Sequence, residues 1–188
     1  LGGQVFSASE VTRVVIPTTL TSCGVVYGDD GPFSYCSELK EVEFASGTTM
    51  IPAYLFSKKC TKIDTITIPN TVTTIGNYAF NGCIGISNIT IPTSITTIGT
   101  GAFSGCTGIS SITIPSSVTT IGERAFSGCS NLANIYGASG VTSIGNYGFN
   151  GCSSLTNTAI GTLLHEGLTL LGGQVFSASE VTRVVIPT

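Results

Sequence analysis

The chain has 188 residues, a length that suits one domain with a sizeable core. Only 9% of the residues are charged, against roughly 25% in an average soluble domain, so the hydroxyls and amides of Thr, Ser and Asn must hydrate the surface. The net charge of -3, with 7 scattered basic residues, excludes a nucleic-acid binder, which needs clustered Lys and Arg, and no apolar run approaches the ~20 residues of a membrane-spanning helix.

Irregular units of a repeat begin the chain, at residues 14–36 and 37–60. The first unit carries five additional residues around Val25 to Asp29, and it has Cys23 where later units have isoleucine. The second carries one additional residue in the stretch 57–60. Both end in a cysteine, as the later units do, which marks them as degenerate copies of the same unit.

Four regular units follow without a gap, each 23 residues long, at 61–83, 84–106, 107–129 and 130–152. Phenylalanine and cysteine return at fixed positions, as Phe80, Phe103, Phe126 and Phe149 and as Cys60, Cys83, Cys106, Cys129 and Cys152. Self-similarity at a fixed period of this length is typical of solenoid proteins.

Within one regular unit the apolar residues predict short extended elements. Ile66 and Ile68 alternate with Thr residues, the period-2 pattern of a strand with one buried face. Pro69 lacks an amide donor and ends that strand. Val72 and Ile75 predict the inward residues of a second, shorter extended segment, and residues 77–83 suit a single helical or 3-10 turn that places a phenylalanine inward.

The last unit, residues 153–179, is about four residues longer than the others, and it ends in Ser179 where a cysteine should stand. Residues 171–188 repeat residues 1–18 without change, at a distance of 170 residues. Either a capping segment was duplicated by engineering, or a block of 170 residues, seven units long, recurs in tandem in a longer parent protein.

One coil of this kind has too little core to be stable alone, but identical neighbours stack into a continuous core. We therefore expect residues 1–188 to form a single, mainly β solenoid in which phenylalanine packs on phenylalanine and cysteine on cysteine. Neighbouring coils lie ~4.8 Å apart, but parallel Cβ vectors do not suit a disulfide. The 7 cysteines are thus expected to be buried free thiols, and zinc is disfavoured because no CxxC pair exists.

The unit pattern I-x-I-P-x-x-V-x-x-I-G-x-x-A-F-x-x-C-x-x-L resembles the BspA-like, or Treponema pallidum type, leucine-rich repeat. The resemblance covers nearly the whole chain and is strong at residues 61–152. It implies a right-handed, curved leucine-rich-repeat solenoid with short strands. It also implies a surface or secreted protein of bacteria or protists that takes part in adhesion.

Catalytic, cofactor and metal sites are not expected. The only histidine, His165, has no recognisable nucleophile partner in the sequence. An enzymatic function would have to be reconsidered only if the chain showed turnover that His165→Ala abolished. Asp29-Asp30-Gly31 has carboxylates that suit calcium, but such a triplet usually makes a turn. The stretch GTGAF at Gly99 to Phe103 is the turn of the repeat and not a dinucleotide loop.

The strands carry a regular array of short polar side chains that should point outward. Its members are Thr65, Thr67, Asn88, Thr90, Ser111 and Thr113. One interpretation is structural, since β-branched threonine is a good polar strand former. The other is a binding face for a protein or a glycan, and a remote third is an ice-binding lattice.

The sequence thus predicts a non-enzymatic, extracellular or cell-surface adhesin without cofactors. Its partner would be a host or neighbouring-cell surface protein or glycan, bound through the strand face. The alternative is a structural segment of a long extracellular fibre or coat, in which the chain continues in tandem or associates end to end with its own copies.

Overall fold

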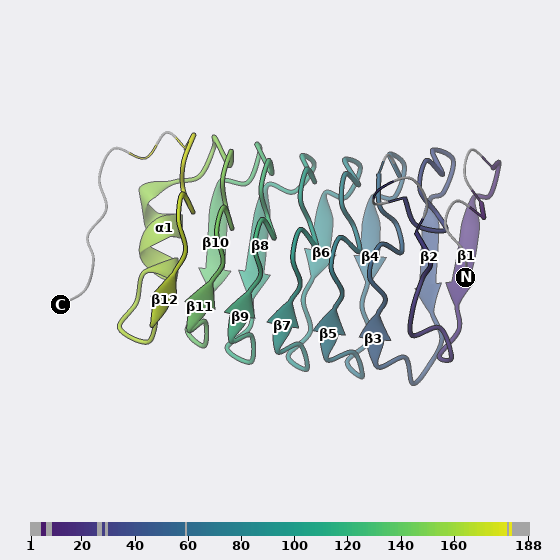
Figure 1. Ribbon diagram of the computed structural model, residues 1–188, viewed down its shortest axis with the longest axis horizontal. Coiled ribbons are helices and arrows are strands. Elements are labelled where there is room, and N and C mark those ends of the chain that lie inside the picture. Colours follow the sequence, from purple (N-terminus) through teal and green to yellow (C-terminus); the bar gives the residue numbers. More distant parts are fainter. Residues whose placement is uncertain are drawn as a thin grey trace.

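The computed structural model describes residues 5–6, 9–25, 28, 30–58, 60–179 and 181, as an elongated stack of coils with two columns of strands (Figure 1). The first column contains β1 (Arg13–Ile16), β2 (Glu41–Phe44), β4 (Thr65–Thr67), β6 (Asn88–Thr90), β8 (Ser111–Ile114) and β10 (Asn134–Gly137). The second contains β3 (Met50–Ile51), β5 (Thr74–Ile75), β7 (Thr97–Ile98), β9 (Thr120–Ile121), β11 (Ser143–Ile144) and β12 (Leu170–Leu171).

All paired strands are parallel, and the pairing repeats the unit length. The second column forms one six-stranded sheet in the order β12-β11-β9-β7-β5-β3. In the first column the ladders join β1 to β2, β4 to β6 and β8 to β10, while β2 contacts β4 and β6 contacts β8. Paired residues such as Ile75 and Ile98 lie one unit apart in the sequence. The mainly β solenoid predicted from the sequence is confirmed.

The third side of each coil is a series of tight turns. They lie where the sequence predicted a single helical or 3-10 turn. The amide of Tyr78 donates along the stack to Thr100 O (2.8 Å), and that of Phe80 donates to Ala102 O (2.9 Å). The amides between them, such as that of Ala79, instead donate back within the coil. Alternate amides can point along the stack because Tyr78 and Gly82 have positive φ angles of 55° and 70°.

The phenylalanines form an unbroken column of stacked rings inside the solenoid. Phe80 and Phe103 have ring centroids 5.4 Å apart, as do Phe103 and Phe126, with interplanar angles of 9° and 12°. Phe80, Phe103, Phe126 and Phe149 are fully buried. Beside them, the isoleucines of both strand columns line the same core. The offset stack adds specific ring contacts to the burial of a large apolar surface.

The cysteines pack beside this column, and all seven are free thiols. Each of the buried ones donates its S–H to the carbonyl of a phenylalanine in the preceding coil. Cys106 Sγ lies 3.0 Å from Phe80 O, and Cys129 Sγ lies 3.1 Å from Phe103 O. Burial raises the pKa of Cys106 and Cys152 to about 12, so these thiols stay protonated at neutral pH and lack the thiolate that reactive cysteines need.

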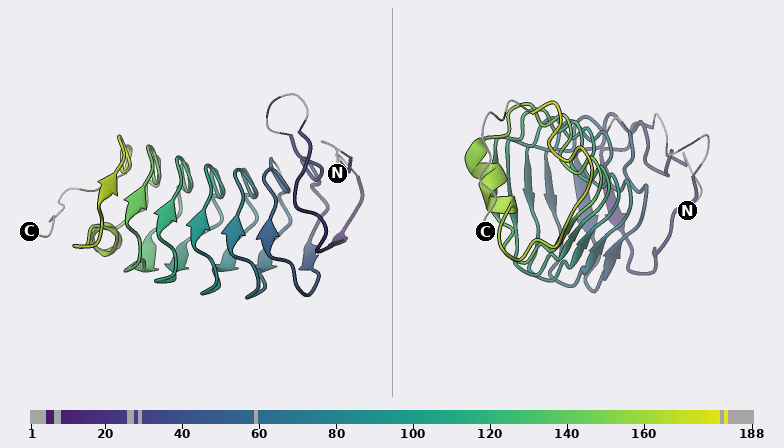
Figure 2. Two further views of the ribbon diagram at one scale, coloured as in Figure 1. Left: turned by 60° about the horizontal axis from the view of Figure 1, so that its bottom comes forward. Right: turned by 60° about the vertical axis from the view of Figure 1, so that its left-hand side comes forward.

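The final coil differs from the others because helix α1 (Asn157–Leu163) stands where a first-column strand would be. Thr156 caps the helix by accepting a hydrogen bond from the Ala159 amide (3.2 Å). The helix buries its apolar side and packs against β10, at the end of the strand column (Figures 1 and 2). Within the described part of the chain, no helix has the length and apolar character to cross a membrane.

Candidate binding face on the strands

The first strand column presents two rows of exposed side chains that run along the solenoid. Ladder register places Thr65 beside Asn88 and Thr67 beside Thr90. The first row consists of Arg13, Glu41, Thr65, Asn88, Ser111 and Asn134, and the second of Val15, Glu43, Thr67, Thr90, Thr113 and Tyr136. The six residues that the sequence singled out, Thr65, Thr67, Asn88, Thr90, Ser111 and Thr113, therefore lie in these two rows and are exposed.

The hydroxyls of this face differ from those of the threonines that directly precede the second-column strands, at Thr73, Thr96, Thr119 and Thr142. There, each threonine Oγ1 donates to the backbone carbonyl of the threonine one coil earlier, as Thr119 does to Thr96 O (3.3 Å) and Thr142 to Thr119 O (3.2 Å). On the first column, the side chains of the six predicted residues make no hydrogen bond to another residue that the structure describes. Their donors and acceptors face solvent.

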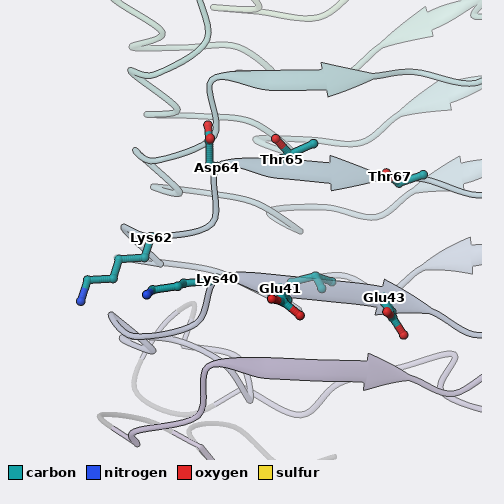
Figure 3. Close-up of a pocket in the computed structure, with 8 residues that line it drawn as sticks. Lys40, Glu41, Glu43, Lys62, Asp64, Thr65 and Thr67 are labelled. Carbon is teal, nitrogen blue, oxygen red and sulfur yellow. The ribbon is translucent and has the colours of Figure 1, made fainter.

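A shallow groove of about 570 Å³ lies between β2 and β4, at the N-terminal part of the face. Glu41 and Glu43 extend from β2 on one side, Thr65 and Thr67 lie along β4 on the other, and Lys40 and Lys62 project past one end (Figure 3). Its other lining residues are Val42 and Asp64.

Ion pairs surround this groove. Arg13 contacts Glu43 at 2.7 Å and Glu41 at 3.3 Å, and Lys62 Nζ lies 2.6 Å from a carboxylate oxygen of Glu38. The hydrogen bond from Lys62, and then its charge, lower the pKa of Glu38. These pairs are exposed, so they add little stability, but they give one end of the face a mixed charge that the hydroxyl-rich middle does not have.

A second shallow groove, of about 400 Å³, continues the face between β4 and β6. Thr65, Thr67, Asn88 and Thr90 line it together with the prolines that end the two strands. Two of the predicted residues, Ser111 and Thr113, extend the rows onto β8. The predicted residues are thus brought together as one continuous surface.

Two features of the face were missed from the sequence. The charged end was not predicted, and neither was Tyr136, which is 55% exposed at the far end of the second row. The signal was present, because Tyr136 stands in unit 130–152 where the three preceding units have Thr67, Thr90 and Thr113. An exposed aromatic ring beside polar side chains is a common anchor in binding sites.

The candidate residues elsewhere that the structure describes, His165 and Asp30, each contact neighbouring groups of the chain. The Gly167 amide donates to His165 Nδ1 (3.0 Å), so Nε2 carries the proton and donates to Ala138 O (3.0 Å). In the triplet Asp29-Asp30-Gly31, the Asp30 carboxylate is buried and pairs with Lys58 at 2.7 Å, while Asp29 lies outside the described residues. Among the described residues, no three His, Cys, Asp or Glu side chains gather as a metal site.

Comparison with known proteins agrees with this architecture. The sequence model described as the BspA type leucine rich repeat region (6 copies) matches residues 1–87 and 73–188. The solved structure of the T. pallidum leucine-rich repeat protein TpLRR shares 22% identity, with a TM-score of 0.70 over 94% of this chain and 79% of that one.

A leucine-rich repeat protein from Bacteroides ovatus is 26% identical, with a TM-score of 0.60 over 93% of this chain. This chain spans about half (51%) of the length of the B. ovatus protein. No curated protein matches the sequence.

Proposed function

Because this chain belongs to the BspA type leucine-rich repeat family, we propose that it is a non-enzymatic binding protein of the cell surface or the extracellular space. Its ligand is a protein or a glycan on a host or neighbouring cell. The ligand docks on the two rows of side chains that β4, β6 and β8 expose.

One observation carries this proposal. The fold uses the threonines that directly precede the second-column strands for its own hydrogen bonds along the stack, as Thr96 and Thr119 show. It makes no such use of Thr65, Thr67, Asn88 or Thr90 within the described structure. Strand formation explains the β-branched shape of the three threonines, but a surface of unused donors and acceptors is what a polar ligand requires.

The chemistry of the face suits polar recognition. Threonine on a strand has few rotamers, so fixing it against a ligand costs little conformational entropy. Hydroxyl and amide groups both donate and accept hydrogen bonds, which matches sugar hydroxyls and peptide groups alike. Tyr136 supplies a ring surface at one end, and the charged groove near Glu41 and Glu43 accelerates association with a charged partner.

Introducing two lysines in the middle of the face tests the proposal. The double variant Thr90→Lys, Thr113→Lys places like charges one coil apart on exposed positions, where they block the face without touching the core. We expect binding of the fluorescently labelled chain to intact cells and to arrays of defined oligosaccharides to fall by at least about tenfold.

The matched control is Thr93→Lys, Ser116→Lys, which adds the same charge at exposed turn residues outside the strands. This control should bind as the unaltered chain does. Equal binding by both double variants would rule out the strand face as the site. Signal on cells without signal on oligosaccharides would identify a protein ligand.

A further inference from the structure

The phenylalanine column begins and ends on the same residue of a duplicated segment. Phe6 and Phe176 are 170 residues apart, within the identical stretches 1–18 and 171–188. Phe6 forms the first rung, against Phe33, and Phe176 forms the last, against Phe149. One sequence therefore occupies both ends of the stack.

At the N-terminal end, this segment packs on the coil that follows it. The ring of Phe6 lies 4.9 Å from that of Phe33, with an interplanar angle of 8°. The Phe6 amide donates to Pro32 O (2.9 Å), and Cys36 Sγ donates to Phe6 O (2.9 Å). These contacts use the face of the segment that looks toward the C-terminus.

At the C-terminal end, the same segment packs on the coil that precedes it. The ring of Phe176 lies 6.1 Å from that of Phe149, with an interplanar angle of 17°. Val175 O accepts from the Phe149 amide (3.0 Å), and Ser177 O accepts from the Gly151 amide (2.9 Å). The two sets of contacts lie on opposite faces of the segment and do not overlap, so one copy of the segment can make both at once.

Both ends also leave apolar surface uncovered. Leu171 pairs with Ile144 and occupies the next position of the isoleucine ladder, yet it is 44% exposed whereas Ile144 is fully buried. At the other end, an apolar groove of about 350 Å³ is lined by Phe6, Phe33, Leu20 and residues 14–17. Val15 in this groove is 50% exposed.

We propose that residues 171–179 of one copy take the place of the matching residues 1–9 on a second copy, which joins the two head to tail into a continuing solenoid while β1 of the second copy stays in place. The structure describes all of residues 171–179. Phe176 then stacks between Phe149 of its own chain and Phe33 of the second copy. The proposal is independent of ligand binding by the strand face.

The exchange is favourable because the contacts that the displaced segment loses are replaced by the same contacts of the incoming segment. Identical residues replace one another on Phe33 and Pro32, so neither the ring stack nor the backbone bonds are lost. The junction adds the burial of Leu171, which the unit alignment places over Cys23, and it brings α1 of the incoming unit alongside β1, over the apolar groove. Each contact is heterologous, so the assembly stays open and extends as a filament.

Two identical substitutions at the two ends test the proposal, because they should act in opposite directions. Phe6→Ala weakens the resident segment and exposes the docking site, so it should tighten self-association of the full chain by at least about tenfold. Phe176→Ala weakens the incoming segment and should loosen self-association by a similar factor. Sedimentation equilibrium over a concentration series measures both.

A second variant avoids the ring column altogether. Leu171→Asn leaves Phe176 in place and changes a side chain that is already half exposed, so it should keep the fold by circular dichroism while loosening association.

Electron microscopy of Phe6→Ala at high concentration should show filaments with an axial repeat of about 34 Å, which is seven coils of ~4.8 Å. Nonspecific aggregation would instead move Phe6→Ala and Phe176→Ala in the same direction. That outcome, or no change in either, overturns the proposal.

Discussion

The four regular coils at residues 61–152 and the irregular coils around them solve the same stacking problem in different ways. In the regular coils, each position meets a copy of itself, so one type of contact recurs along the stack. Cys83, Cys106 and Cys129 each donate to a phenylalanine carbonyl at 3.0 to 3.1 Å. A residue type that packs well against its own copy therefore makes the same contact with the coil before it and the coil after it.

The N-terminal coils keep this cysteine bond, as Cys60 shows by donating to Phe33 O (3.0 Å), but they also bury polar side chains. Of the described residues, the buried polar ones are Asp30, Ser34, Thr48 and Ser57, all before the regular units. Ser34 Oγ lies 2.9 Å from Ser57 Oγ, and the Gly31 amide donates to Ser57 Oγ at 3.0 Å. Each such pair must be matched residue by residue. Buried polar side chains thus distinguish the N-terminal coils from the regular ones.

The largest expected effect separates the middle of the phenylalanine column from its end. Phe103→Ala removes a fully buried ring with stacked neighbours on both sides, and should cost ~3–5 kcal/mol of unfolding free energy. Phe176→Ala removes an end rung with one described ring neighbour and should cost roughly half of that or less. Urea denaturation followed by circular dichroism measures both. A loss below ~1 kcal/mol for Phe103→Ala would place this ring outside the core.

The regular coils were also the part that the sequence could predict. Because one pattern recurs in four units, alignment of the units alone predicts which residues point inward and which are exposed. The inward residues include Ile66, Val72 and Ile75, and the exposed ones include Thr65 and Thr67. Periodicity averages out the local ambiguity that makes a single short strand hard to assign. The same periodicity predicted that the six side chains of the two rows point outward, and the structure shows them exposed.

Features that break the period could not be predicted. Helix α1 replaces a strand in the final unit because residues 157–163 bury Ala159, Ile160 and Leu163 at helical spacing, a pattern that occurs once. A second feature keeps the period and still could not be predicted. The position of Tyr78 and Tyr147 has a positive φ angle in six consecutive units, from Tyr54 to Gln174, although tyrosine rarely adopts one. Hydrogen bonds to the next coil stabilise this conformation, and such bonds between distant residues leave no local signal.

Alkaline titration gives the next largest contrast. Burial raises the pKa of Cys106 from 9.0 to about 12, so between these values the unfolded chain loses a proton that the folded chain keeps. Stability is therefore unaffected below pH 9 and falls as the pH rises through this window, by up to ~1.4 kcal/mol per pH unit for each such thiol.

Cys106→Ala should remove one thiol's share of this slope, as measured by urea denaturation at a series of pH values. Burial raises the pKa of the half-buried Cys23 only to about 11, so Cys23→Ala should change the slope over a narrower range. An unchanged slope in Cys106→Ala would mean that the middle coils do not shield their thiols from water better than the ends do.

The smallest expected effect is that of glycine-to-alanine substitutions on the free energy of unfolding, and its sign differs between a regular coil and the final one. A Cβ at Gly122 would lie 2.6 Å from Thr100 N, so close stacking of the coils forbids it, and Gly122→Ala should cost ~1–3 kcal/mol. A Cβ at Gly161 in α1 would meet nothing within 4 Å, so Gly161→Ala should add ~0.5–1 kcal/mol through helix propensity. Thermal and urea unfolding at low protein concentration compares the two. Because Gly161 faces outward only while the final coil has no neighbour, a gain that turns into a loss as the concentration rises would place another molecule against α1.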